Sequence, residues 1–521
     1  MNEQNEIWIL VGLFAVAIPL IAIARRVNIA YPIVLVIGGL ILGFIPGLPN
    51  VQLDPNLVLV ICLPPLLYWE AVTAPTDVIR ANASQIWTLA MGLVTVTAIV
   101  VAVIAHATIT NMSWAMAFVL GAIVAPTDEL ASVPVLERMR MPRHVVAIVV
   151  GESLLNDASA LIIYRFAIVA ALTGFFSLGS AVVSFLVAAV GGIVAGLIVG
   201  RLGVEGWRRI KDTNLQGIIS FEMGYLAYLV AERLNLSGVL AVVYAGTTAN
   251  RWSPKVLTPQ TRLQGVSAWE TFVFFINALL FLLLGLQLHT LGRAVFLEYS
   301  WQTVLWYALI VNLAVIGTRF IWILGIEYVP WIGGSSEHEN GDWRHAIIVA
   351  WAGLRGAVSL AAALAIPVGI AGAHLDHRNL VIFLTFSVIL VTLVGGGLTL
   401  PWVVRRLEVP EDTAEADEEV RRGIVGMSEA ALRELDAIAA EGNLDERQVQ
   451  RLRDRYEHKR RHVDGHTDDE VRALEAEVRL VSAERRALLE MRERGEIDNT
   501  VVRELQRVLD ITEQRLERMT H

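Results

Sequence analysis

The chain has 521 residues, of which 55% are hydrophobic and 18% charged, and its mean hydropathy is +0.56. Soluble proteins average about 25% charged residues, so this composition excludes an ordinary soluble globular protein. Residues 1–406 hold 22 basic and 21 acidic residues, whereas residues 407–521 hold 20 basic and 30 acidic residues and so account for the chain's net charge of −9. We therefore expect two regions, an apolar body of residues 1–406 and a polar tail of residues 407–521.

The body divides into apolar runs long enough to cross the hydrocarbon core of a bilayer, which takes roughly 17–25 residues. The first run is not a signal peptide, because acidic rather than basic residues precede it. The pattern predicts an all-α polytopic membrane protein with about thirteen transmembrane helices. They fall near residues 7–24, 31–48, 57–74, 86–108, 114–132, 144–170, 180–200, 215–232, 236–250, 269–289, 301–324, 345–370 and 379–403.

The number of basic residues alternates between high and low in successive segments that connect these runs. Segments after odd-numbered runs carry sixteen Lys and Arg residues, and those after even-numbered runs carry three, Arg233, Arg293 and Arg378. Cytoplasmic loops are enriched in basic residues. We therefore expect a multi-pass protein of the cell (inner) membrane, with its N-terminus outside and its tail in the cytoplasm.

Five of the acidic residues inside the predicted spans are candidates for a functional role, and only three arginines lie in the spans with them. Such residues usually pair with one another or mark an ion path. Since acids outnumber bases, we expect some of these carboxylates to bind something from solution. For Glu222 taken by itself, two interpretations stay open, a structural ion pair and a functional role. Arg165 and Arg319 are each interpreted as a member of a structural ion pair. The acids are Glu70, Asp128, Glu152, Asp157 and Glu222, and the arginines are Arg165, Arg319 and Arg355.

The stretch "GESLLNDASALIIYRF" at residues 151–166 has a helical pattern of polar residues. Residues four apart share a helix face, so Ser153 lines up with Asp157, and Glu152 with Asn156. A hydroxyl and a carboxylate are hard oxygen ligands suited to a small hard cation. The Ser153 face is therefore a candidate cation site.

Two predicted spans carry signals for a break. Pro126 interrupts the fifth span beside Thr127 and Asp128, because proline lacks a backbone donor. The glycine-flanked "WAGLRGAVSL", residues 351–360, is a second candidate with Arg355 at its centre, although it lacks a proline. Broken helices at membrane depth line cavities and supply cation ligands in transporters.

Four stretches together resemble the monovalent cation:proton antiporters of the sodium/proton exchanger group, in particular their NhaP-type bacterial and archaeal members. They occur in family order within residues 7–406: "LPPLLYWEA", "GAIVAPTDELAS", "GESLLNDASALIIYRFA" and "WAGLRGAVSLAAALAIP". The resemblance implies thirteen helices in two inverted repeats, with two discontinuous crossing helices. It also implies a core part, a dimerisation part that makes a homodimer, and a helical cytoplasmic tail.

The resemblance also implies roles for individual residues. Asp157 binds either the cation or the proton, and Glu152 pairs with Arg355 in a buried salt bridge. Asn156 forms a hydrogen bond toward the first break. A Na+ shell is completed, partly through water, by Ser153, Asp128, the Thr127 carbonyl and Glu70. This chain departs from many members in having Glu129 where they have proline.

The expected function is secondary active antiport of Na+ (or Li+ or K+) for H+, by alternating access with competition for Asp157, in the service of pH homeostasis. Exchange is expected to be electroneutral and one-for-one, because Asn156 is neutral where related electrogenic antiporters have an aspartate. The alternative is a cation channel, or a membrane sensor that signals through the tail. The cation preference stays open.

We expect neither an enzyme nor a cofactor, and the expected partners are membrane lipid and the transported ions, without nucleic acid. There is no Walker-type phosphate loop and no metal-ligand spacing among the histidines. His338 is interpreted as part of a polar loop. The single cysteine, Cys62, excludes an internal disulfide.

The tail repeats leucine and valine at three- and four-residue steps, which predicts amphipathic helices. Breaks are expected at Gly442, Gly465 and Gly495, and Asp498 is a candidate helix cap. A solvated extension that aids assembly and a regulatory domain both remain possible for this region.

Overall fold

A computed structural model of the chain divides into two compact units, Met1–Glu411 and Asp412–His521. Each unit is described by itself. The structure describes residues 3–27, 29–45, 58–174, 178–328, 343–367, 369–370, 373–409, 413–441, 444–461, 468–494, 505–506, 509 and 512–513.

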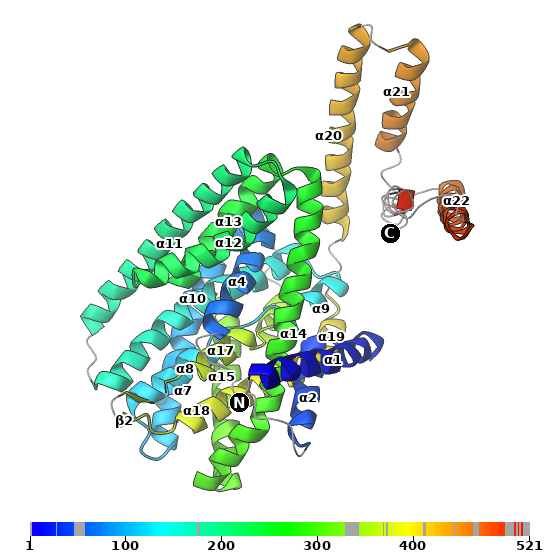
Figure 1. The fold of residues 1–521 in the computed structure, drawn as a ribbon. Coiled ribbons are helices and arrows are strands. Elements are labelled where there is room, and N and C mark those ends of the chain that lie inside the picture. Colours follow the sequence, from blue (N-terminus) through cyan, green and yellow to red (C-terminus); the bar gives the residue numbers. More distant parts are fainter. Residues whose placement is uncertain are drawn as a thin grey trace. The chain divides into compact units, whose positions relative to one another are not determined.

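The first unit is built almost entirely of helices (Figure 1). Its first half contains α1 (Glu3–Val27), α2 (Tyr31–Gly43), η1 (Val58–Cys62), α4 (Leu63–Thr73), α5 (Thr76–Ala81), α6 (Ala83–Trp87), η2 (Thr88–Leu93), α7 (Val94–Thr108), α8 (Trp114–Val124), α9 (Val133–Arg138) and α10 (Arg143–Thr173). Its second half contains α11 (Leu178–Arg209), α12 (Thr213–Arg233), α13 (Gly238–Val256), α14 (Pro259–Glu298), α15 (Trp301–Tyr328), α16 (Trp343–Trp351), α17 (Ala357–Leu364), β1 (Gly369–Ile370), β2 (Ala373–His374), α18 (Arg378–Leu390), η3 (Val391–Gly396) and α19 (Gly397–Leu407).

Every apolar run predicted from the sequence contains helix. Within the described residues, six helical stretches are long and apolar enough to cross a membrane. Three shorter apolar helices accompany them, at Tyr31–Gly43, Val60–Thr73 and Trp114–Val124. The six are Ala83–Thr108, Arg143–Thr173, Val182–Arg209, Pro259–Glu298, Trp301–Gly325 and Arg378–Leu407.

Local signals define several helix ends. The Ser113 side chain accepts a hydrogen bond from the Met116 backbone N–H at 3.2 Å, which caps the start of α8. The long helix α10 ends at Thr173, and the next residue, Gly174, adopts a left-handed backbone conformation with φ of 72°. Glycine takes this conformation without steric cost, so it ends the helix sharply.

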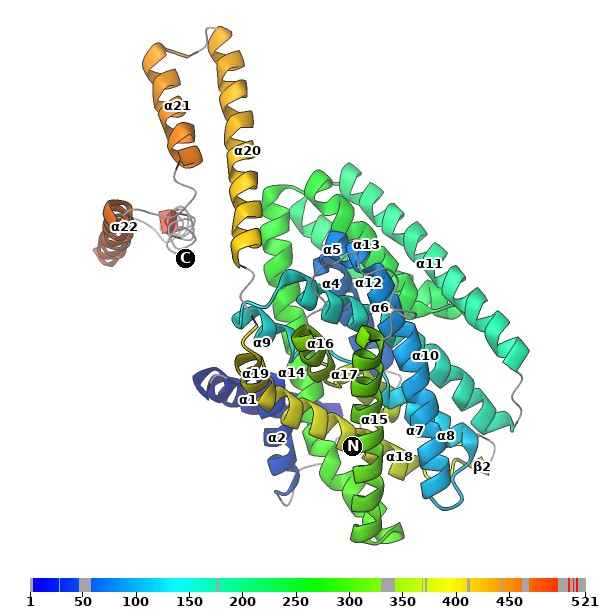
Figure 2. The ribbon, with the colours of Figure 1, turned by 180° about the vertical axis from the view of Figure 1, so that it is seen from behind.

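Close packing joins helices that are distant in sequence. α14 lies along α2, where a Cβ on Gly39 would come within 2.2 Å of the Leu282 carbonyl oxygen. Only glycine permits this approach of two helix backbones. In Figures 1 and 2, α11, α12 and α13 lie side by side, and α13 also packs against α4.

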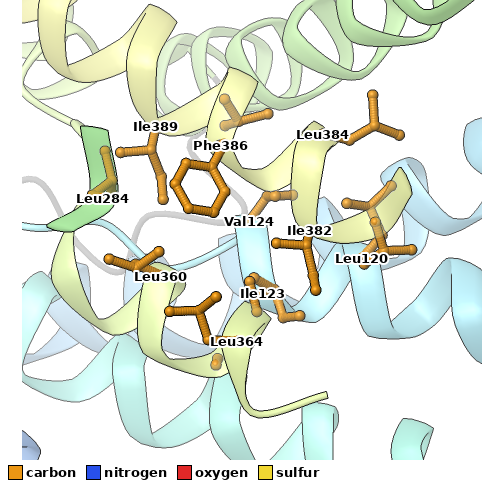
Figure 3. Close-up of a cluster of buried hydrophobic side chains, with 14 of the residues drawn as sticks. Leu120, Ile123, Val124, Leu284, Leu360, Leu364, Ile382, Leu384, Phe386 and Ile389 are labelled. Atoms are coloured by element: carbon orange, nitrogen blue, oxygen red, sulfur yellow. The ribbon is translucent and has the colours of Figure 1, made fainter. Parts of the chain in front are cut away.

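An apolar cluster packs α8, α17 and α18 against one another (Figure 3). α8, α17 and α18 supply most of the side chains labelled in Figure 3, and α14 adds Leu284. Because these side chains are buried against one another, the cluster stabilises α8 and α17 although they have only 11 and 8 residues. The buried members include Leu120, Ile123, Val124, Leu360, Leu364, Ile382, Phe386 and Ile389.

The second unit contains the predicted tail helices, α20 (Thr413–Ala440), α21 (Glu446–Arg461) and α22 (Asp468–Glu493). α20 packs against α21, and an Arg453–Asp436 ion pair of 2.5 Å joins them. The expected breaks at Gly442, Gly465 and Gly495 and the expected cap at Asp498 lie outside the described residues.

Candidate functional site

Two helices of the first unit are interrupted, and their interruptions meet. One lies between α8, which ends at Val124, and α9, which begins at Val133. The other lies between α16 and α17, where residues 353–356 are not helical. The Asp128 backbone N–H donates to the Leu354 carbonyl at 2.7 Å, which joins the two interruptions directly. Both breaks predicted from the sequence are confirmed.

A small cavity lies beside this crossing. Its volume is about 10 Å³, near the smallest volume that holds one water molecule. α4 contributes Glu70, α10 contributes Ser153 and Asp157, and the first interruption contributes Thr127 and Asp128. All five residues of the predicted cation shell therefore face one space. Gly356, Val358 and Ser359 line it from the other broken helix.

Two polar side chains of α10 hold the first interruption in place. The Ser153 hydroxyl donates to the Thr127 carbonyl at 3.0 Å, and the Asn156 amide donates to the Thr127 hydroxyl at 2.7 Å. The predicted hydrogen bond from Asn156 toward the break is thus confirmed. Since a carbonyl oxygen has two lone pairs, the Thr127 carbonyl keeps one acceptor position beside its bond to Ser153.

Glu152 has a different partner from the one expected. Its carboxylate forms a two-point ion pair with Arg319 of α15, with one contact of 2.9 Å between Nη2 and Oε2 and a second between Nη1 and Oε1. Arg319 also donates to the carbonyls of Val349 at 2.8 Å and Ala350 at 3.0 Å. The predicted Glu152–Arg355 salt bridge is therefore wrong, and the structural pairing expected for Arg319 is confirmed.

Arg355 instead binds backbone carbonyls. Its guanidinium donates to Gly353 and, at 3.2 Å, to Val124, the last residue of α8. The C-terminus of a helix carries partial negative charge, so a buried cation there stabilises the broken end. The Arg355 backbone N–H also donates to the Thr392 hydroxyl at 3.2 Å. We conclude that Arg355 braces the two interruptions, and that it makes no direct ion pair with an acid among the described residues.

The two glycines around Arg355 are required for close contacts. A Cβ on Gly353 would lie 2.0 Å from the Arg319 Nε atom, and one on Gly356 would lie 1.6 Å from an oxygen of Asp128. The other Asp128 oxygen accepts from the Leu130 backbone N–H at 2.8 Å. The second interruption therefore fits against both the ion pair and the cavity only because these positions lack side chains.

The remaining candidates lie away from the cavity. Arg165 pairs with Glu232 and contacts the Leu236 carbonyl at 3.5 Å, which confirms its structural pairing. Glu222 is exposed on α12 and does not line the cavity. His338 lies outside the described residues.

Within the part of the chain that is described, no three His, Cys, Asp or Glu side chains cluster as a metal centre. The donors of the cavity are mixed, with carboxylates beside hydroxyl and backbone carbonyl oxygens. This donor set suits hard cations such as Na+ more than transition metals.

Interrupted helices that meet beside a carboxylate-lined cavity in an apolar helical protein are the arrangement of ion-coupled secondary transporters. The profile of the transmembrane sodium/hydrogen exchangers matches residues 12–406. The chain belongs to this family, and membership supports sodium/proton exchange as its activity. Within this family, the chain resembles the NhaP-type antiporters in its fold as well as in its sequence motifs.

Individual relatives extend this likeness to most of the chain. An uncharacterized Na(+)/H(+) exchanger of Mycobacterium tuberculosis (strain ATCC 25618 / H37Rv) is 35% identical, over 98% of this chain and 96% of its own. A sodium, potassium, lithium and rubidium/H(+) antiporter of Bacillus pumilus is 32% identical, over 74% of this chain and 60% of its own. The sodium proton antiporter MjNhaP1 of Methanocaldococcus jannaschii shares the fold, with a TM-score of 0.62 at 19% identity, over 78% of this chain and 99% of its own.

Proposed function

We propose that the protein is a secondary active antiporter that exchanges Na+ (or Li+ or K+) for H+, with both ions competing for Asp157. The observation that carries this proposal is the cavity at the crossing of the broken helices. It gathers Asp157, Asp128, Glu70, Ser153 and Thr127 in one space about the size of a water molecule. The Bacillus pumilus relative, whose name includes sodium, potassium and lithium, supports this range of cations.

The two acids of α10 then have separate tasks. Glu152 is neutralised permanently by Arg319, and both side chains are at most 3% exposed. Asp157 has no ion pair with any described residue and lines the cavity. Because a buried charge without a partner is costly, an empty ionised site cannot move readily, whereas a site with one proton or one cation can. Competition at Asp157 thereby enforces exchange.

Exchange is proposed to be electroneutral, with one cation traded for one proton. Asn156 beside Asp157 is neutral and bonded to the Thr127 hydroxyl, so it neither releases nor takes up a proton. The Glu152–Arg319 pair has no net charge. These contacts leave Asp157 as the exchangeable carboxylate of α10.

We propose that residues 1–406 form thirteen transmembrane helices in two inverted repeats, with a core part and a dimerisation part. Rocking of the core part against the dimerisation part would give alternating access to the cavity. The protein is proposed to act as a homodimer in the cell (inner) membrane and to serve pH homeostasis. The N-terminus lies outside and residues 407–521 form a cytoplasmic tail, as the distribution of basic residues supports.

The rival function is a cation channel, or a sensor that signals through the tail. A channel would be expected to use a continuous hydrated pore with repeated rings of ligands. Here the ligands are concentrated in one small cavity. The test is a proteoliposome assay in which a preset pH gradient is monitored while Na+, Li+ or K+ is added. An antiporter dissipates the gradient without any compensating ion leak, and an unchanged gradient with all three cations at several pH values would exclude antiport.

A further inference from the structure

Glu129 is a carboxylate next to the cavity that the proposed mechanism does not use. It stands between Asp128 and Leu130, which both line the cavity. Its backbone carbonyl accepts from the N–H groups of Ser132 at 3.0 Å and Val133 at 2.9 Å, where the chain turns into α9. These bonds fix the position of Glu129 against the cavity wall.

Glu129 is partly buried. Its Oε2 atom is buried and has no hydrogen-bond partner among the described residues. The charged groups that act on it are acidic: Glu70, Asp128 and Asp157 on the cavity side, and Glu137 on α9. Burial of a bare carboxylate in such surroundings is costly. A proton or a monovalent cation from solution is the ion available to neutralise this oxygen.

The acids around Glu129 differ in their exposure, and this difference defines a direction from the exposed Glu137 to the cavity. Glu137 is exposed on α9, Glu129 has a buried carboxylate oxygen, and Asp157 lies in the cavity. We propose that Glu129 is a further cation-handling residue, which holds the monovalent cation between the Glu137 side of α9 and the Asp157 cavity. This inference rests on the proposed antiport, because it assigns a step of the same cation's path. A carboxylate oxygen is a suitable ligand for a hard cation such as Na+ or Li+.

The test measures initial exchange rates in proteoliposomes against the concentration of Na+, and separately of Li+, at constant pH. We expect Glu129→Gln to raise the apparent KM for both cations several-fold and to retain the maximal rate at saturating cation. Glu129→Asp, which keeps the charge, should restore much of the affinity. Glu205→Gln is the matched control, because the Glu205 side chain on α11 is 43% exposed and pairs with Arg209 at 2.9 Å. It should leave KM unchanged.

Equal KM values for Glu129→Gln and Glu205→Gln would overturn the assignment. So would a lower maximal rate with an unchanged KM, because this indicates a structural role. A failure of Glu129→Asp to improve on Glu129→Gln would also count against a charge-based role. Unmodified protein and Asp157→Asn are measured in parallel. If the unmodified protein does not exchange, the proposed function itself fails, whereas exchange with no effect at Glu129 removes only this inference.

Discussion

Glu152 and Arg319 form a buried two-point ion pair although 167 residues separate them in the chain. The pair links α10, which carries Asp157, to α15. Thr127 donates its hydroxyl to the same carboxylate at 3.3 Å. The ion pair is therefore bonded to the first interruption as well as to a neighbouring helix.

Removing one member of this pair should destabilise the protein strongly. We expect Glu152→Ala and Arg319→Ala each to cost about 3–5 kcal/mol, because the remaining charge is buried without a partner. The double variant should lose much less than the sum of the single losses. Thermal unfolding of the purified variants measures this coupling. The comparison is the double variant that combines Glu152→Ala with Arg355→Ala. If the coupling energy of Glu152 with Arg355 exceeds that of Glu152 with Arg319, the contact seen in the structure is contradicted.

Gly353→Ala should weaken the same ion pair without changing either charge. Its Cβ would come within 2.3 Å of the Arg319 guanidinium carbon, so the arginine has to move. We expect a lower unfolding temperature than that of the unmodified protein. Gly217→Ala on α12 is the control, because nothing lies within 4 Å of its Cβ position. That change should be neutral or stabilising by roughly 0.5–1 kcal/mol. Equal effects of the two substitutions would argue against the close contact.

Gly356→Ala should impair exchange by acting on the cavity. The new Cβ would overlap the Asp128 carboxylate, which lines the cavity, at 1.6 Å. Because Asp128 cannot stay in place, we expect weaker cation binding and a large loss of exchange in the pH-gradient assay. Correct folding is checked by size-exclusion chromatography of the purified variant. If a well-folded Gly356→Ala protein keeps the normal KM for the cation, the position of the Asp128 side chain in the cavity is not required for cation binding.

Asp157→Asn should abolish exchange while the protein still folds. The substitution is nearly isosteric, and Asp157 has no ion pair with a described residue that would be broken. The amide cannot bind and release a proton, so competition between the two ions is lost. Proteoliposomes with the purified variant measure the effect, and an unfolding temperature close to that of the unmodified protein confirms folding. Appreciable exchange would remove Asp157 as the carrier.

One-for-one exchange predicts that membrane voltage does not shift the exchange equilibrium. Each net charge moved would add about 2.3 kcal/mol per 100 mV to the driving force. The measurement uses proteoliposomes clamped with potassium and valinomycin, with Na+ or Li+ as cargo. Voltage that changes only the rate is compatible with the proposal. A shift in the final ratio of cation to proton gradients would show that exchange is electrogenic.

The sequence by itself determined the features that depend on nearby residues. The lengths of the apolar runs predict helices, and Pro126 predicts the end of α8 because the missing backbone donor acts within one turn. The spacing of Ser153 and Asp157 places them on one face of α10 and so, as the structure shows, in one cavity. The bond from Asn156 to Thr127 also matched the expectation from the family motifs.

Only the tertiary structure decided which arginine pairs with Glu152. Arg319 and Arg355 both lie inside apolar spans, and their guanidinium groups have the same chemistry. Helix packing brings α15 to Glu152, whereas the backbone at Gly353 directs Arg355 to the free carbonyl of Val124 at the end of α8. A buried cation binds whichever acceptors the packing places within reach. That choice depends on contacts between helices and leaves no local pattern in the sequence.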